Sequence, residues 1–247
     1  MSIADLADGL RSADPDRYAM AALAPVGARD RLVTLYALNL ELARTPLQSN
    51  EPLIAEMRVQ WWVDRLRAMA DAPPPPHELL TPIHDAWGGE AALLAVLAEG
   101  RRRDAGREPF DTAHDVADYV AGTQGALMRL AARASGIDAD IAAKQGLGAG
   151  IATWLRAQPT LQQIGLGLRD PSPEHLAEIA RLGQAAFRDA ARQRRQAGKA
   201  SVLYPGPGAG ATLRAVAQGK PIPPISDFAR KGGLARLAIT GRWWVNP

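Results

Sequence analysis

The 247-residue sequence contains no cysteine. Disulfides, thiolate nucleophiles and cysteine metal sites are therefore excluded, and the composition fits a reducing compartment. The longest apolar runs, such as residues 91–98, fall far short of the roughly 18–20 residues that a membrane-spanning helix needs. Residues 1–16 are acidic where a signal or transit peptide would be basic. We therefore expect a soluble, cytoplasmic protein, with peripheral association at a membrane left open.

Several motifs that carry chemistry are also missing. The sequence has no GxxxxGKS/T phosphate loop, no GxGxxG after a strand and no GxSxG nucleophile elbow. Its four histidines are scattered, without the spacing of a zinc site, so we expect no metal site. Gly146, Gly148 and Gly150 lie in a helical stretch, where small residues favour close helix packing over phosphate binding.

The net charge of +3 hides an asymmetry. Residues 181–247 contain twelve Lys or Arg against Asp189 and Asp227, a net charge of +10, so the remainder carries −7. A basic segment favours an anionic partner, such as an acidic protein, an anionic lipid or a diphosphate, and we expect no nucleic acid. One hypothesis is an anionic membrane surface bound through residues 181–247 and the Trp243–Trp244 pair. The plainer interpretation is that these arginines form solvated helix faces.

The stretch from Arg29 to Leu66 predicts two amphipathic helices joined by a polar turn. Thr45-Pro46 ends the first helix, and Ser49 to Pro52 caps the second. Apolar spacing at i, i+3, i+4 and i+7 selects one inward face on each helix. The first face holds Leu32, Leu35, Tyr36, Asn39, Leu42 and Ala43, and the second holds Leu53, Ile54, Met57, Trp61 and Met69. In the Trp61–Trp62 pair, we expect one ring in the core and the other at the surface or a cavity rim.

The rest of the chain also shows helical periodicity and no useful strand alternation. Further helices are predicted at 3–11, 15–24, 77–87, 90–103, 112–136, 138–158 (stopped by Pro159), 173–197, 211–218 and 225–240. The Pro- and Gly-rich residues 204–210 predict a loop. We therefore predict an all-α protein with a single domain spanning residues 1–247.

Asp111 and Asp115 form the only DxxxD spacing in the chain. Carboxylates at i and i+4 project from one helix face and could hold Mg²⁺. They also stand where a helix begins, and acidic residues in a first turn are stabilised by the helix dipole. Capping is the preferred interpretation, because a facing second set of carboxylates is missing.

Four segments in order resemble the squalene/phytoene synthase family. They are DRYAMAALAPVGARDRLVTLYALNLELA, MRVQWW, EGRRRD followed by PFDTAHDVADYVAGTQGALMRLA, and GAGIATWLRAQP. The resemblance implies the isoprenoid-synthase fold, a helical bundle around a central apolar cavity. In active members, two aspartate-rich motifs on facing helices bind Mg²⁺ while two prenyl diphosphates are coupled head to head.

This chain departs from the family at both aspartate motifs. The first motif is replaced by Ala43, Arg44 and Leu47, with Leu40 where active members carry arginine, and the second by Thr153, Ala157 and Leu161. Arg156 persists. Without carboxylates, the metal that neutralises the leaving diphosphate is lost, and Arg44 would repel it. We therefore predict no catalytic residues and no cofactor, and Mg²⁺ only if the chain is a divergent prenyltransferase.

The segments ALNLELA, MRVQWW, DYVAGTQ and LRAQP most resemble the family's non-catalytic branch of respiratory complex I assembly factors. The resemblance implies a remnant pocket for an isoprenoid or other lipid, or for a segment of a complex I subunit. Its candidate residues are Tyr36, Asn39, Glu41, Gln60, Trp61, Thr123, Gln124, Thr153 and Arg156. Because an unpaired buried polar group costs about 1–3 kcal/mol, these side chains either bond to one another or line that pocket.

Three functions are therefore open. The first is a pseudoenzyme that supports complex I assembly. The second is a divergent prenyltransferase that uses Asp111 and Asp115. The third is a basic module that binds a membrane surface, which is compatible with the first.

Overall fold

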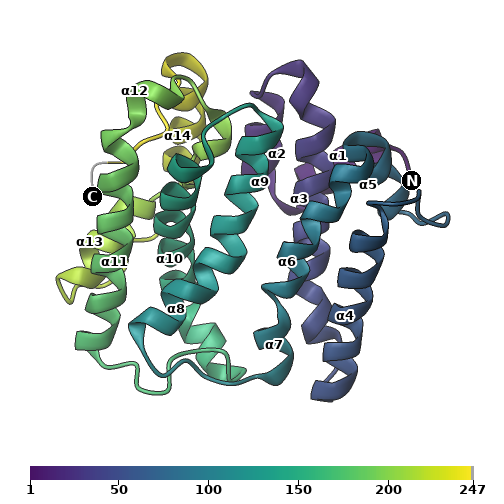
Figure 1. Ribbon diagram of the computed structural model, residues 1–247. Coiled ribbons are helices and arrows are strands. Elements are labelled where there is room, and N and C mark those ends of the chain that lie inside the picture. The colour runs from purple at the N-terminus through teal and green to yellow at the C-terminus, as the bar shows by residue number, and fades with distance from the viewer. Residues whose placement is uncertain (246–247) are drawn as a thin grey trace. The chain divides into compact units, whose positions relative to one another are not determined.

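The structure is a computed structural model that describes residues 1–245 (Figure 1). In these residues every regular element is a helix, and the isolated β-bridge joins Phe110 to Leu168. The predicted all-α class is confirmed. Packing divides the chain into two compact units, Met1–Arg107 and Glu108–Pro247, which are described in turn. The central cavity and the single-domain organisation over residues 1–247 stay predictions.

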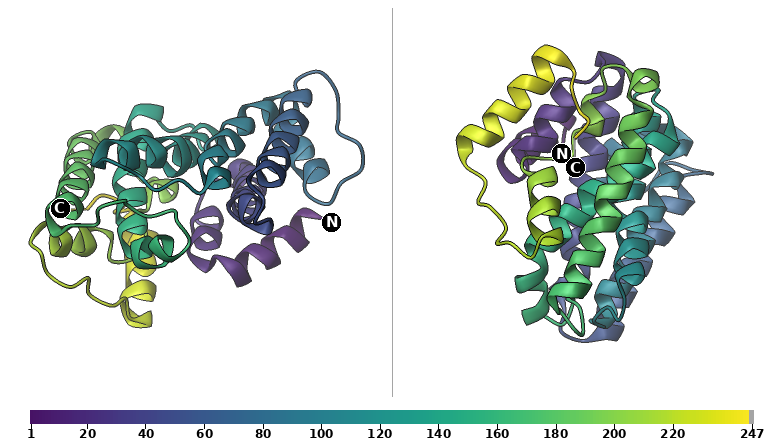
Figure 2. Two further views of the ribbon diagram at one scale, coloured as in Figure 1. Left: turned by 90° about the horizontal axis from the view of Figure 1, so that it is seen from below. Right: turned by 90° about the vertical axis from the view of Figure 1, so that its left-hand side faces the viewer.

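The first unit is built from helices that are joined by short turns, except for the longer proline-containing loop at residues 69–79 between α4 and α5 (Figure 1). Its α-helices are α1 (Ile3–Ala13), α2 (Pro15–Ala22), α3 (Arg29–Arg44), α4 (Pro52–Ala68), α5 (Leu80–Trp87), α6 (Ala95–Glu99) and α7 (Arg102–Gly106). Its 3-10 helices are η1 (Val26–Ala28), η2 (Thr45–Gln48) and η3 (Gly88–Leu94). Helices α1 and α2 lie against α3 (Figure 2), and α4 packs on α6 and α7. The hairpin of α3 and α4 is confirmed.

The predicted inward face of α3 is buried except for the half-buried Ala43, and burial extends beyond it to Val33, Thr34 and Leu38. Leu32, Leu35, Tyr36 and Leu42 are all buried. Pro46 cannot continue the α-helix, and η2 carries the chain to Pro52, which occupies the first turn of α4. Burial of this stripe gives the unit its core.

The predicted inward face of α4 is wrong. Four residues of that face are 38% to 69% exposed, namely Leu53, Ile54, Met57 and Trp61, and only Met69 is buried. The core instead takes the stripe of Ala55, Val59, Trp62, Val63 and Leu66. Both stripes have helical spacing, so periodicity alone could not choose between them.

The predicted long helix over 90–103 is also wrong. The chain forms η3, α6 and α7 there, with interruptions at both ends of α6. Gly100 follows α6, and glycine costs about 1 kcal/mol relative to alanine inside a helix. Trp87, at the end of α5, anchors this region, because its indole Nε1 donates to the carbonyl of Arg31 at 3.1 Å and to Thr34 Oγ1 at 3.2 Å.

The second unit centres on one long helix, α10 (Ala139–Gln163), which packs against α9 and α11 (Figures 1 and 2). Its other α-helices are α8 (Ala113–Val120), α9 (Ala126–Ala134), α11 (Pro173–Arg192), α12 (Arg194–Ala197), α13 (Ala209–Ala217) and α14 (Asp227–Thr240). A π-helical turn, η4 (Ala121–Gly125), joins α8 to α9, and a 3-10 turn, η5 (Ser201–Leu203), precedes α13. The predicted loop at 204–210 gives way to α13 at Ala209.

The glycines of α10 allow close helix packing, as predicted. A Cβ at Gly146 would lie 2.9 Å from the Cα of Gly125, and one at Gly148 would lie 2.5 Å from Phe187. A Cβ at Gly150 would collide with Val120 and lie 2.8 Å from the Cβ of Gln124. No larger residue fits at these positions without moving α11 or η4.

Pro159 does not stop α10, contrary to the prediction. The helix continues to Gln163 with the proline inside it. Proline removes one backbone donor, and the Nε2 of Gln158 donates to Oε1 of Gln162 at 3.0 Å across the same turn. This side-chain bond supports the turn that the proline weakens.

In the described residues 1–245, no helix has both the length and the apolar character required to cross a bilayer.

Candidate ligand sites

Tyr36 presents a buried hydroxyl without a hydrogen-bond partner among the described residues. The side chain is 2% exposed on α3. Burial raises the pKa of the Tyr36 phenol well above its usual value, and the nearby Arg17 only partly opposes this effect. The Arg17 guanidinium lies 5.9 Å from the ring centroid and is paired with Asp14 at 2.8 Å. Tyr36 is therefore a neutral donor with an open hydrogen bond.

Asn39 lies one helical turn beyond Tyr36 on the same side of α3. It is 8% exposed. Leaving a buried polar group unpaired, as the Tyr36 hydroxyl is, costs about 1–3 kcal/mol. An open hydroxyl and an amide on one helix face suit a polar atom of a ligand.

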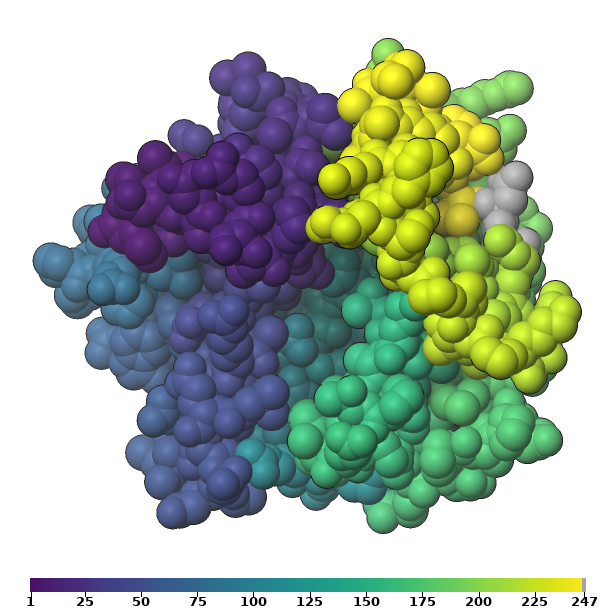
Figure 3. Space-filling view, turned by 180° about the vertical axis from the view of Figure 1, so that it is seen from behind, coloured from purple at the N-terminus to yellow at the C-terminus, as the bar shows by residue number. Residues whose placement is uncertain are grey.

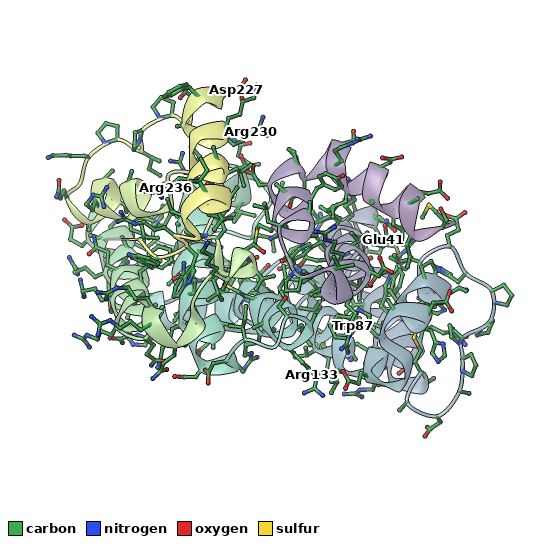
Figure 4. All side chains as sticks on the ribbon, turned by 90° about the horizontal axis from the view of Figure 1, so that it is seen from above. Glu41, Trp87, Arg133, Asp227, Arg230 and Arg236 are labelled. Carbon is green, nitrogen blue, oxygen red and sulfur yellow. The ribbon has the colours of Figure 1, made fainter. Side chains whose placement is uncertain are left out.

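Glu41 lines a cavity of about 430 Å³ in the first unit. The cavity lies between α1, α3 and residues 77–79, and Figure 4 shows Glu41 on α3. Leu40 and Arg44 share its lining with Trp62 and His77. Arg44 therefore brings a cation beside Glu41, at a position where the family resemblance expects a metal-binding carboxylate.

Gln60 and Trp61 on α4 have different surroundings. The Nε2 of Gln60 donates to Asp64 at 2.6 Å, and its Oε1 accepts a hydrogen bond from Arg102. Gln60 is therefore hydrogen-bonded, but by Asp64 and Arg102, which are not among the candidate residues. Trp61 is partly exposed and lies 5.0 Å, centroid to centroid, from the buried Trp62 in an edge-on arrangement. The expected division of this pair between core and surface is confirmed.

Thr123 and Gln124 lie in the π-helical turn η4 of the second unit. The hydroxyl of Thr123 donates to the carbonyl of Tyr119 at 2.8 Å, and the side chain of Gln124 packs beside Gly150. Single π turns inside α-helices are frequent at functional sites. Sequence reasoning missed this turn, and its only signal was the pair of glycines at 122 and 125.

Thr153 and Arg156 lie one helical turn apart on α10. Thr153 is exposed, and its hydroxyl donates to the Ala149 carbonyl at 3.0 Å. A terminal nitrogen of Arg156 donates to the carbonyl of Pro223 at 3.0 Å, while its Nε is buried without a partner. Partial burial lowers the pKa of Arg156. Arg156 thus holds the segment before α14.

The acidic pair at the start of α8 has structural partners. Thr112 caps the helix, and the carboxylate of Asp115 accepts the backbone N–H of Thr112 at 2.9 Å in a capping box. Asp111 instead accepts from Nε of Arg169 at 2.6 Å. The preferred interpretation as a cap is confirmed for Asp115. Among residues 1–245, no group of three or more Asp, Glu or His is arranged to hold a metal ion.

A second cavity, of about 540 Å³, lies at the C-terminal end of the second unit and was not predicted. It is formed by residues 204–211, α14 and residues 242–245. Its cations are Arg214, Arg236 and Arg242. The available signals were the Pro- and Gly-rich loop and the basic charge of this segment.

Trp243 cannot serve the surface role that the sequence suggested. It is buried, and its indole Nε1 donates to the carbonyl of Gly198 at 3.1 Å. Its own carbonyl accepts from the Nε2 of Gln145 at 3.3 Å. Only Trp244 of this pair lies partly exposed at the cavity.

The helical architecture is that of the isoprenoid synthases. It is similar to a crystal structure of a dehydrosqualene synthase in complex with a ligand, with a TM-score of 0.73 and 12% sequence identity. The similarity covers 95% of this chain and 94% of that one, and it shows the fold alone. The sequence itself goes further, because the squalene/phytoene synthase family model matches residues 10–166, more than half of the chain. The chain belongs to the squalene/phytoene synthase family. A sequence search of curated proteins finds no match.

Proposed function

We propose that this chain is a non-catalytic member of the family that supports the assembly of respiratory complex I. The observation that carries the first half of this proposal is the chemistry of the six positions that the resemblance assigns to metal binding. None is a carboxylate, since they are Ala43, Arg44, Leu47, Thr153, Ala157 and Leu161. Mg²⁺ prefers carboxylate oxygens, and a diphosphate leaving group needs that charge neutralised. Arg44 supplies a positive charge instead.

The prenyltransferase alternative has weaker support. It needs Asp111 and Asp115 as metal ligands, and both carboxylates already have structural roles in an ion pair and a helix cap. Mg²⁺ would have to displace Arg169 from the first and end the capping box of the second. These contacts favour the non-catalytic proposal.

The link to complex I rests on sequence. The segments ALNLELA, MRVQWW, DYVAGTQ and LRAQP follow the pattern of the assembly-factor branch. In the structure they fall on α3, α4, the α8–η4 junction and α10, which form the helical scaffold of each unit. A protein that keeps the helices of the fold but lacks the metal ligands can still bind a partner or a ligand. The retained segments are therefore consistent with a binding role.

The ligand or client would bind at the α3 face that holds Tyr36 and Asn39. A polar atom of an isoprenoid or another lipid, or a backbone carbonyl of a complex I subunit, would satisfy the Tyr36 hydroxyl. The apolar neighbours Leu35 and Leu42 supply the hydrophobic surroundings of that face.

Two measurements test the proposal. Deletion of the gene should lower the amount of assembled NADH:quinone oxidoreductase, and the wild-type chain should restore it. Incubation of the purified chain with farnesyl or geranylgeranyl diphosphate and Mg²⁺ should release no more pyrophosphate than a heat-treated control. Release above that control would support the prenyltransferase alternative, and unchanged complex I would remove the assembly role.

A further inference from the structure

Helix α14 places large apolar side chains in solvent. Within Asp227–Thr240 only Leu237 is buried, whereas Phe228 is 87% and Ile239 is 78% exposed. Phe228 and Ile239 are eleven residues apart, which is close to three helical turns, so they lie on one side of the helix and about 16 Å apart along it. Figure 3 shows α14, in yellow, at the surface of the second unit.

Cations border this apolar line. Lys231 and Arg236 lie on either side of it by helical spacing, about 60° and 80° from Phe228 at about 100° per residue. Residues 209–245 contain six Lys or Arg against Asp227 alone, so this segment carries a net charge of +5. Asp227 itself is paired with Arg230 at 3.4 Å. An apolar line flanked by positive charge is typical of a helix that lies in the plane of a membrane interface.

The C-terminal cavity of about 540 Å³ opens beside the same helix. Arg236, labelled in Figure 4, lines it from α14, and Arg242 lines it from the segment after α14. The Nε of Arg242 is buried without a hydrogen-bond partner, and its guanidinium lies 5.5 Å from the ring centroid of Trp244. Among the described residues that line the cavity, none is Asp or Glu.

The chemistry of this cavity suits a phosphate group. Guanidinium groups bind phosphate oxygens through paired hydrogen bonds. The cavity also contains the start of α13, a nine-residue helix whose first backbone N–H groups favour an anion. Trp244 and Phe228 in the same lining provide the apolar surface on which a lipid chain could rest.

We propose that α14 and the C-terminal cavity form a docking surface for a bilayer that contains anionic phospholipid. A lipid phosphate binds Arg236 and Arg242 in the cavity, while Phe228 and Ile239 enter the apolar layer. The positive charge of the segment complements the negative membrane surface. Two isolated apolar side chains can enter the interfacial layer of a bilayer, whereas a folded protein partner would need a continuous apolar patch. This surface is independent of the proposed role in complex I assembly.

Sedimentation of the full chain with vesicles tests the surface. Binding should be strong to vesicles that contain phosphatidylglycerol, weak to pure phosphatidylcholine, and reduced by salt. Each cation at a membrane surface contributes about fivefold in partitioning, so Arg236→Gln with Arg242→Gln should lower binding about 25-fold. Phe228→Ser with Ile239→Ser should also lower it, with the salt dependence retained.

The matched control removes two charges elsewhere in the basic segment. Arg194→Gln with Arg195→Gln changes exposed residues of α12 that do not line the cavity. This variant should lose less than about twofold, because its charges lie outside the phosphate site. An equal loss in both double variants would overturn the proposal in favour of a general charge effect. Wild-type binding by the Arg236 and Arg242 variant would overturn it as well.

A second readout separates a lipid phosphate from a free one. Anionic vesicles should shift the tryptophan emission of the wild-type chain to shorter wavelength, and Trp244→Phe should remove most of that shift. Inorganic phosphate at the same phosphate concentration should leave the emission unchanged. Binding of inorganic phosphate without binding of vesicles would overturn the membrane proposal, as would binding of neither. Far-UV circular dichroism of every variant verifies that the helices remain folded.

Discussion

The carboxylate of Asp111 accepts a hydrogen bond from Nε of Arg169 at 2.6 Å. This contact joins the start of α8 to the segment after α10, where Phe110 and Leu168 also form a β-bridge. The hydrogen bond that Arg169 donates to Asp111 raises the pKa of Arg169, so its guanidinium stays protonated. Asp111 therefore forms an ion pair with Arg169 where these two segments meet. A metal ion would have to compete with Arg169 for the Asp111 carboxylate.

Loss of the α8 cap should destabilise the protein measurably. Thr112→Ala removes the side chain that accepts the N–H of Asp115 at 3.1 Å, and N-cap removal typically costs about 1 kcal/mol. For a chain of this length we expect a fall in Tm of about 2–4 °C in calorimetry. Thr112→Ser, which keeps the hydroxyl, is the control. A Tm shift on addition of Mg²⁺ that Asp111→Asn abolishes would contradict the structural role of this turn.

Gly150 should tolerate no side chain. Gly150→Ala places a Cβ against Val120 and Gln124, and overpacking of this kind typically costs about 1–3 kcal/mol. Gly122→Ala in the same unit is the matched control, because a Cβ there meets nothing within 4 Å. Urea titration should show a lower midpoint for Gly150→Ala and an equal or higher one for Gly122→Ala. Equal midpoints would show that α10 and η4 are not in close contact.

Tyr36→Phe should separate stability from function. The variant removes a buried hydroxyl that has no partner, so unfolding free energy should stay equal or rise by about 1 kcal/mol. If that hydroxyl binds the ligand or client, the same variant should restore less complex I in the deletion strain. Leu35→Ala, which only weakens the core, is the comparison. A stable variant with full rescue would remove Tyr36 from the proposed site.

Alkaline pH should lower the stability of the wild type more than that of Tyr36→Phe. The phenol of Tyr36 ionises near its usual pKa of 10.0 when the chain is unfolded, while burial raises the pKa in the folded state. Above about pH 10 the unfolded chain therefore loses its proton first, and stability falls as the pH rises. Urea midpoints of the wild type should drop more steeply above pH 10 than those of Tyr36→Phe. Parallel curves would contradict the burial of this phenol.

The two stripes of α4 should respond differently to truncation. Leu66→Ala removes a fully buried side chain and should cost about 2–5 kcal/mol. Met57→Ala, on the exposed stripe, should change stability by no more than about 0.5 kcal/mol. Thermal or urea unfolding measures both. A larger loss of stability in Met57→Ala than in Leu66→Ala would show that the face predicted from the sequence is the buried one.

Sequence reasoning was strongest where one pattern excluded its alternatives. The α3 stripe, the turn at Pro46 and the capped start of α8 follow from local spacing and caps. It failed on α4, because that helix has two apolar stripes and tertiary packing chooses between them. Pro159 also misled it, since α10 continues to Gln163 with the proline inside it.

The candidate site shows a similar division. The resemblance identified Tyr36 and Asn39 by residue type, and the structure adds that both are buried and that the Tyr36 hydroxyl has no partner among the described residues. It could not tell that Gln60 is already satisfied, because Arg102 is 42 residues away in sequence. The C-terminal cavity also depends on residues that are distant in sequence, since it brings Arg236 and Arg242 together with a loop near residue 206. Such long-range contacts leave no periodic signal.

The role in complex I assembly is tested by the amount of assembled NADH:quinone oxidoreductase in membranes of a deletion strain, measured by native gel with an activity stain. We expect a clear fall on deletion and full recovery with the wild-type chain. Recovery should persist with Asp111→Asn combined with Asp115→Asn, since no metal chemistry is involved. Unchanged complex I in the deletion strain would contradict the assembly role, and loss of recovery with a double variant that circular dichroism shows to be folded would contradict the absence of metal chemistry.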